Sequence, residues 1–172
     1  MRVPRAVTAE NLPLKQRPFD LFLAVVFAVF AVTTAMADFM PSLGVELTPD
    51  SPNFLVRMNY AYAADTDPLF LRHPFWMRLV TGLSAFVYAP FYVVLVWALV
   101  KGKNGIQLPA VVYASACATI TGVLVFGVAL FGEPEWRTPN PVKFLLLNGP
   151  YAVMPLVLLA RMRKAMPFTR KF

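Results

Sequence analysis

Four long stretches of this chain contain no charged residue. They run over Leu21–Ala37, Leu79–Val100, Asn104–Gly132 and Phe144–Ala160. The hydrocarbon core of a bilayer is about 30 Å thick and a helix rises about 1.5 Å per residue, so a span needs roughly 20 apolar residues. The second and third stretches reach that length, and the first and last reach it with their flanks. The sequence therefore predicts an all-α, polytopic membrane protein with four transmembrane helices.

The composition leaves little material for a second domain. Of the 172 residues, 58% are hydrophobic. We expect a cytoplasmic N-terminal segment at 1–17, loosely ordered, one transmembrane domain at 18–163, and a cytoplasmic tail at 164–172. The single cysteine, Cys117, excludes an intramolecular disulfide framework.

The net charge of +7 reflects membrane topology rather than nucleic-acid binding, because most basic residues flank the spans on one predicted side. By the positive-inside rule this side is cytoplasmic, so both termini are expected there, and the basic residues favour contact with membrane lipids. The basic residues on this side are Arg2, Arg5, Lys15, Arg17, Lys101, Lys103, Arg161, Arg163, Lys164, Arg170 and Lys171.

Prolines and polar residues inside the spans predict kinked helices around a central cavity. Pro90 leaves the Phe86 carbonyl without its helical donor, and Pro150 and Pro155 are expected to break the fourth span. A hydrogen-bonded bundle core is the alternative to a cavity. The polar residues at membrane depth are Thr33, Thr34, Thr81, Ser84, Tyr88, Ser115, Thr119, Thr121, Asn148 and Tyr151. The connection 39–78 is expected to cover the bundle or to rest on the bilayer.

Two aspartates are the candidates for chemistry. Asp38 ends the first predicted span and Asp67 lies shortly before the second. Two carboxylates in a low-dielectric pocket would share a proton or bind a cationic amine, whereas the alternative is ordinary solvation at a span boundary. The only histidine, His73, is expected in a loop, and the chain has no zinc, nucleotide or serine-hydrolase motif. We therefore predict no catalytic residue, no metal and no cofactor.

Several short motifs together resemble the EXPERA-domain family, most closely its sigma-2 receptor branch, which is related to the emopamil-binding protein. The motifs are M-A-D-F-M at 36–40, T-D-P-L-F at 66–70, W-M-R at 76–78, A-P-F-Y at 89–92, L-V-K-G at 99–102, L-P-A-V-V-Y at 108–113 and G-P-Y-A-V-M-P at 149–155. They occur in order across about 150 residues.

The resemblance implies a helical bundle whose cavity holds sterols or cationic amphiphiles. It implies that Asp38 contacts a ligand amine, that Asp67 supports it by hydrogen bonding, and that Tyr151 lines the pocket. Ser84 and Tyr88 stand where that branch has a glutamate and a glutamine, and Thr34 stands where the isomerase branch has a histidine. The predicted ligand-binding residues are Asp38, Asp67, Tyr151, Ser84, Tyr88, Thr119 and Asn148.

The predicted function is therefore binding of sterol-like lipids or cationic amphiphiles within the membrane. The alternatives are a sterol or isoprenoid double-bond isomerase and a scaffold or trafficking partner without a ligand. The resemblance implies the endoplasmic reticulum membrane in a eukaryote, and a bacterial chain would lie in the inner membrane. The resemblance also implies a homodimer. The small residues Ala110, Ala114, Ala118 and Gly122 would allow close helix contact, either between two chains or within one bundle.

Overall fold

The computed structural model describes residues 9–171 and contains four helices long and apolar enough to cross a membrane. They cover Pro18–Ser42, Phe75–Lys101, Asn104–Phe131 and Pro141–Arg161. Their outward faces carry exposed large apolar side chains, among them Val93, Val123 and Phe131, as expected for contact with lipid. The prediction of an all-α polytopic bundle is confirmed.

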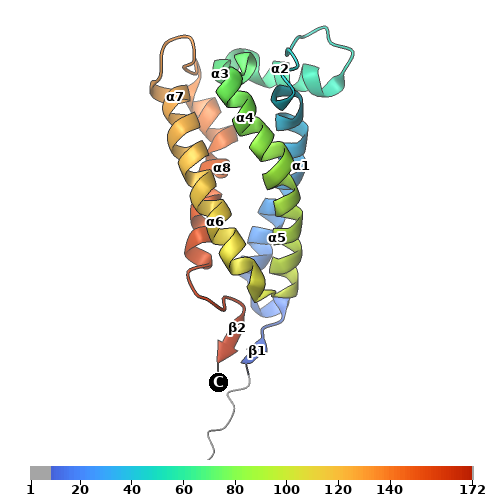
Figure 1. Cartoon of the computed structure of the whole chain (residues 1–172), viewed down its shortest axis with the longest axis vertical. Helices are drawn as coiled ribbons and strands as arrows, with labels where there is room; N and C mark the ends of the chain where they lie inside the picture. The colour runs from blue at the N-terminus through green and yellow to red at the C-terminus, as the bar shows by residue number, and fades with distance from the viewer. Residues whose placement is uncertain (1–8, 172) are drawn as a thin grey trace, which may run out of the picture.

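The four long helices form two packed halves, which Figure 1 shows standing side by side. In the first half, α1 (Pro18–Ser42) packs along α4 (Phe75–Leu83), η2 (Ser84–Tyr88) and α5 (Ala89–Lys101). In the second, α8 (Pro141–Arg161) packs along α6 (Gln107–Cys117) and η4 (Ala118–Val125), which continues into α7 (Phe126–Phe131). Two short 3₁₀ turns, η1 (Leu14–Gln16) and η3 (Asn104–Ile106), precede α1 and α6.

Two of the long helices contain π-helical turns, and the fourth long helix is not broken. The segments η2 and η4 are π-helical turns, and η2 directly precedes Pro90, whose ring cannot donate to the Phe86 carbonyl. The fourth span was predicted to break, which is wrong, because α8 runs through Pro150 and Pro155 without interruption. Pro155 leaves the Tyr151 carbonyl without its helical donor, and the Cys117 thiol donates to that carbonyl instead at 3.8 Å.

The first span continues beyond its predicted end near Asp38. α1 extends to Ser42 and holds Pro41 in its last turn. Asp38 is therefore one turn inside the helix rather than at its boundary.

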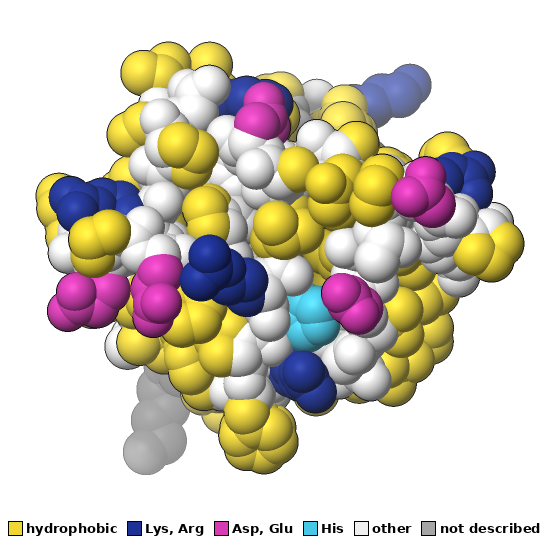
Figure 2. Space-filling view, turned by 90° about the horizontal axis from the view of Figure 1, so that it is seen from above, with side chains coloured by type: hydrophobic (Ala, Val, Ile, Leu, Met, Phe, Trp, Pro, Cys, Tyr) yellow, Lys and Arg dark blue, Asp and Glu magenta, His cyan; other side chains and the backbone are white. Residues whose placement is uncertain are grey.

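The connection after α1 folds back over one end of the bundle and forms a lid. It consists of α2 (Phe54–Thr66) and α3 (Pro68–Arg72). Asp67 ends α2 and caps the start of α3, and the Thr138 hydroxyl donates to the buried Thr66 carbonyl at 2.6 Å, which ties the lid to the α7–α8 connection. Figure 2 shows this face from above, with charged side chains spread around hydrophobic ones.

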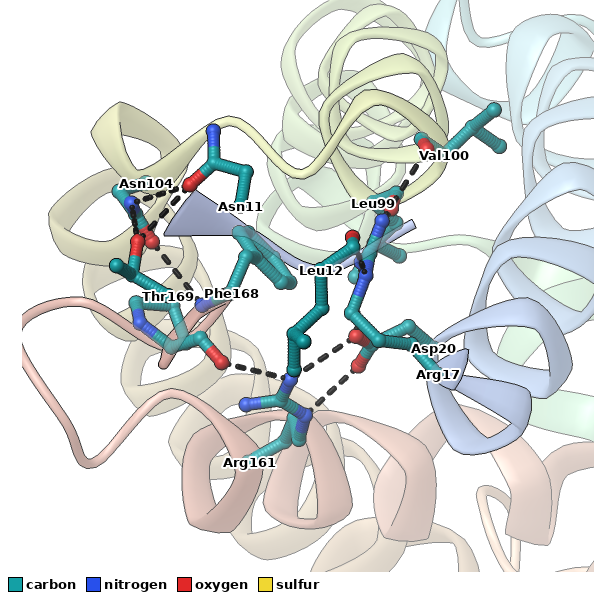
Figure 3. Close-up of polar contacts among 11 residues, drawn as sticks. Asn11, Leu12, Arg17, Asp20, Leu99, Val100, Asn104, Arg161, Phe168 and Thr169 are labelled. Carbon is teal, nitrogen blue, oxygen red and sulfur yellow. Dashed lines mark hydrogen bonds and ion pairs between the residues drawn. The ribbon is translucent and has the colours of Figure 1, made fainter. Parts of the chain in front are cut away.

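A network of buried charges closes the other end (Figure 3). The Asp20 carboxylate accepts hydrogen bonds from Arg17 at 2.9 Å and from Arg161 at 2.7 and 2.9 Å. Both guanidinium groups also lie against the Phe168 ring, at 5.0 and 5.3 Å from its centroid. Arg17 further donates to the Leu99 carbonyl at 2.8 Å, at the carboxyl end of α5. We call Arg17, Asp20, Arg161 and Phe168 the clasp.

The chain ends are joined beside the clasp. β1 (Ala9–Asn11) pairs antiparallel with β2 (Thr169–Lys171). The expectation that 1–17 is loosely ordered is therefore wrong for 9–17, where backbone pairing and the buried Arg17 order the chain. Residues 1–8 lie outside the described part.

The row of small residues in the third span is used inside the bundle. Ala110 and Ala114 are fully buried, α6 packs on α8, and a methyl group added to Gly122 would lie 3.8 Å from the Ala152 methyl. These residues let two helices of one chain approach closely.

Candidate functional site

A cavity of about 500 Å³ lies between the two halves, beneath the lid. Its wall is formed by α1, the lid, α4 with η2, η4 and α8, and most of the lining side chains are apolar. Small-molecule sites have this size and character, with a few polar groups that orient the ligand.

Asp38 projects from α1 into the cavity wall, next to Ser84 of η2. Thr34, one turn earlier on α1, lines the same cavity. The ion pairs among residues 9–171 involve the carboxylates of Asp20, Asp65 and Glu135. Asp38 therefore faces an apolar space with no basic side chain paired to it in the part of the chain that the structure describes.

Asp67 reaches the cavity from the junction of α2 and α3. One carboxylate oxygen accepts from the Phe70 amide at 3.0 Å, and the other accepts from the Tyr62 hydroxyl at 3.2 Å. Burial raises the pKa of Asp67 to about 6, against the opposing effect of these two hydrogen bonds. Asp67 is thus held by its own backbone turn while its carboxylate stays at the cavity wall.

Tyr62 links the lid to the fourth long helix. Its hydroxyl donates to Asp67 and accepts from the Asn148 side-chain amide at 2.7 Å. Burial and the Asp67 charge both raise the pKa of the Tyr62 phenol, so it remains a neutral donor. Asn59, also on α2, donates to the Ala37 carbonyl at 2.9 Å and fastens the lid beside Asp38.

Aromatic residues form the part of the cavity farther from the lid. The Tyr151 ring stacks on Phe30 with centroids 4.2 Å apart, and its hydroxyl is hydrogen-bonded to Thr33. The Tyr92 hydroxyl is hydrogen-bonded to that of Tyr113 at 3.0 Å. These contacts hold the aromatic side chains in place at the end of the cavity away from the lid.

The structure brings six of the seven predicted ligand-binding residues to one cavity. Asp38, Asp67, Ser84, Tyr88, Asn148 and Tyr151 all line it. Thr119 does not, because it is exposed on η4 and its hydroxyl donates to the Ser115 carbonyl at 3.0 Å. Cys117 and Thr121 face the cavity in its place.

The sequence analysis missed the two lid residues that hold the site together. Tyr62 and Asn59 lie in an aromatic-rich segment whose structure the sequence left open. A useful signal was present, since Asn59 and Tyr62 are three residues apart and share one face of a helix.

The cavity offers carboxylates but no cluster that suggests a metal. Among residues 9–171, no three histidine, cysteine or acidic side chains come together. His73 is buried at the end of α3, with Nδ1 3.1 Å from the Leu71 carbonyl, and is not among the lining residues.

Comparison with known proteins identifies a family and similar proteins. The family model described as EXPERA (EXPanded EBP superfamily) matches residues 54–162. The chain is also similar to the "Sigma intracellular receptor 2" of Xenopus tropicalis, with 29% identity over 137 residues that cover 75% of this chain and 78% of that protein. The family match begins at α2, so it includes Asp67, Ser84, Tyr88, Asn148 and Tyr151, whereas Asp38 precedes it.

Proposed function

Because this chain belongs to the EXPERA family, we propose that it is an integral membrane, receptor-like protein that binds cationic amphiphiles or sterol-like lipids in its intramembrane cavity. The resemblance predicted from the sequence is confirmed, and the similarity to a sigma intracellular receptor supports a receptor-like role.

One observation carries the proposal: two aspartates, Asp38 and Asp67, line a single apolar cavity, and neither forms an ion pair among the described residues. Burying a carboxylate without a counter-charge is costly, so such a site favours an entering cation. The apolar wall would hold the remainder of an amphiphile. In this arrangement Asp38 receives the ligand nitrogen, and Asp67, held by Tyr62, adds a second negative charge.

The test is binding of a labelled cationic amphiphile to purified protein in nanodiscs. Saturable binding by the wild type is expected, with a loss of at least about tenfold in affinity for Asp38→Asn, because a charged hydrogen bond contributes roughly 1.5–3 kcal/mol. Asp65→Asn is the matched control, since Asp65 pairs with Lys143 at the surface and does not line the cavity. Equal affinity of wild type and Asp38→Asn would contradict the proposal. A folded wild type that binds no amphiphile would favour the scaffold alternative.

A sterol double-bond isomerase is the second candidate, because the same cavity holds two carboxylates. Such a reaction needs a proton donor at one carbon and an acceptor at another. Asp67, with its pKa raised to about 6, would be the donor and Asp38 the acceptor. We rank this candidate second because the chain's only histidine lies outside the cavity wall. Incubation with a Δ8-sterol in heavy water decides: if no deuterium-labelled isomer forms, the reaction is excluded.

We also propose a membrane orientation, based on the distribution of exposed basic residues. We place the clasp end, where Lys15, Lys101, Lys103, Arg163 and Lys164 are exposed, on the cytoplasmic side of the endoplasmic reticulum membrane. We also propose a homodimer, whose interface does not use the small residues of α6 because these pack on α8.

A further inference from the structure

The two ends of the bundle differ in the charge that they present. At the lid end, acidic and basic side chains are equally numerous, and Figure 2 shows both signs on that face. At the clasp end, the only acidic side chain that the structure describes is Asp20, which is 1% exposed and already bonded to Arg17 and Arg161. Glu10 of β1 is the other acid of this end, and the strand register sets it opposite Arg170. The charged residues at the lid end are Glu46, Asp50, Asp65, Glu133, Glu135, Arg57, Arg72, Arg78, Arg137 and Lys143.

Three lysines gather at one corner of the clasp end. Lys101 is the last residue of α5, and Lys103 lies two residues farther along the chain. Lys15 belongs to η1, which is held against the same helix end because Arg17 donates to the Leu99 carbonyl at 2.8 Å (Figure 3). All three lysines are exposed, and none forms an ion pair within residues 9–171. The corner therefore presents uncompensated positive charge.

The turn at the end of α5 directs one of these lysines toward the lipid-facing side. Gly102 is left-handed, with φ 65°, and the Lys103 amide donates to the Ala98 carbonyl at 2.9 Å, as in a Schellman motif. The Lys103 ammonium consequently lies 5.9 Å from the centroid of the Trp97 ring. Trp97 is exposed, and so is Val93 one turn earlier on the same face. An exposed tryptophan next to an apolar helix face is typical of the depth at which lipid headgroups lie.

A similar pair at the lid end lacks this free charge. The Arg72 guanidinium lies 5.7 Å from the centroid of the Trp136 ring, but the Glu135 carboxylate is 3.8 Å from Arg72. The lysine corner is therefore distinguished by its unpaired charge and not by a cation beside an aromatic ring.

We propose that Lys15, Lys101 and Lys103 form a headgroup site for an anionic phospholipid, whose acyl chains lie along Trp97 and the apolar face of α5. In phosphatidylcholine the ammonium group neutralises the phosphate, whereas an anionic phospholipid keeps a net negative charge for the lysines. One lysine near an anionic membrane surface favours binding by about fivefold. This site is on the outer surface, so it does not depend on a ligand in the cavity.

Quenching of Trp97 fluorescence by brominated lipids tests the site. Trp76→Phe combined with Trp136→Phe leaves Trp97 as the single tryptophan. This full-length protein is placed in bilayers of equal parts phosphatidylcholine and phosphatidylserine, and only one of the two lipids carries bromine, near the headgroup end of its acyl chains. Exchanging the brominated lipid keeps the composition constant, so the two quenching efficiencies report which lipid lies beside Trp97. We expect phosphatidylserine to bind there about fivefold more tightly than phosphatidylcholine.

Variants of the corner separate its effect from that of the whole protein's charge. Replacing Lys15, Lys101 and Lys103 by glutamine should abolish the preference without lowering the melting temperature, because these side chains are exposed and unpaired. Replacing the same lysines by arginine should keep the preference. Arg137→Gln is the matched control, since it removes an exposed positive charge at the lid end and should leave the preference unchanged.

Three outcomes would overturn the inference. The first is equal quenching of Trp97 by the two brominated lipids while all three lysines are present. The second is a preference for phosphatidylserine that survives the three glutamine substitutions. The third is an equal loss of preference in Arg137→Gln, which would mean that net charge and not this corner selects the lipid. If the single-tryptophan variant does not fold, the fluorescence that Trp97→Phe removes from the otherwise unaltered chain gives the same comparison.

Discussion

We expect Asp20→Asn to destabilise the protein by about 3–5 kcal/mol, because it leaves two largely buried arginines without their counter-ion. Asp20 is 1% exposed, and Arg17 is 6% exposed. The Asp20 carboxylate accepts three hydrogen bonds from guanidinium groups, at 2.7, 2.9 and 2.9 Å. Asparagine keeps one acceptor oxygen and presents an amide donor to a guanidinium donor.

The magnitude follows from counting what the substitution removes. Asparagine can retain one of the three hydrogen bonds, so two charge-assisted bonds are lost, at roughly 1.5–3 kcal/mol each. This gives about 3–6 kcal/mol, which agrees with the cost of breaking a buried ion pair by removing one partner. The destabilisation should also affect the paired chain ends, because Arg161 donates a hydrogen bond to the Pro167 carbonyl at 2.9 Å, just before β2.

Asp65→Asn is the matched control for burial. Its partner, Lys143, donates to it at 2.9 Å, a distance similar to those in the clasp. Both side chains are exposed, however, and an exposed ion pair contributes little to stability.

The assay is the thermal unfolding of both variants and the wild type in the same detergent. We expect Asp65→Asn to unfold with the wild type and Asp20→Asn to unfold well below it, or to fail to accumulate as folded protein. Unfolding of Asp20→Asn at the temperature of Asp65→Asn would refute the reasoning, because it would mean that the buried carboxylate contributes no more than a surface one.

The other predictions concern the cavity and the helix contacts. Affinity for a quaternary ammonium amphiphile, whose charge does not titrate, should fall as the pH is lowered through about 6, because Asp67 is a carboxylate above that pH and neutral below it; a flat profile from pH 7.5 to 5 would contradict this. Tyr62→Phe removes a hydrogen bond that stabilises the Asp67 carboxylate, so the pKa of Asp67 should rise and the loss of affinity should begin at a higher pH, as the same titration would show. Ala114→Leu should lower stability by about 1–3 kcal/mol, since Ala114 is fully buried on α6, whereas Val112→Leu on the exposed face of the same helix should be neutral in thermal unfolding.

Local features of the chain were enough to predict the spans and most of the polar side chains in the cavity wall. Uncharged apolar length identifies a transmembrane helix by itself. Ser84 and Tyr151 could be assigned to the interior because polar side chains at membrane depth avoid lipid, whereas Asp38 was assigned to the pocket through the family resemblance. The ligand-binding role of these residues stays a prediction.

The clasp could not be predicted, because its partners are distant in sequence. Asp20 and Arg161 are 141 residues apart, and each has an ordinary local reason to be where it is, at the start and end of a helix. Only the side-by-side packing of the two halves brings them together.

Thr119 was misplaced because the depth of a residue in the membrane does not say which face of the helix it occupies. Cys117 and Thr121 are four residues apart and share the face toward the cavity, where the Cys117 sulfur lies 3.7 Å from the Thr121 hydroxyl. Thr119 is two residues from each, about half a helical turn away, so its side chain is exposed on the opposite face.

The cavity lies between two ends of the bundle that each have a packed core of their own. Toward the clasp, Leu95, Leu99 and Leu158 are completely buried in one cluster, and in the lid Leu69 and Ala63 are completely buried in another. A ligand that binds between them adds contacts to both, so it should raise the unfolding temperature progressively as its concentration rises above its dissociation constant. Asp38 and Asp67 lie at the lid end of the cavity, where Asn59 and Tyr62 of α2 are hydrogen-bonded to the Ala37 carbonyl and to Asp67.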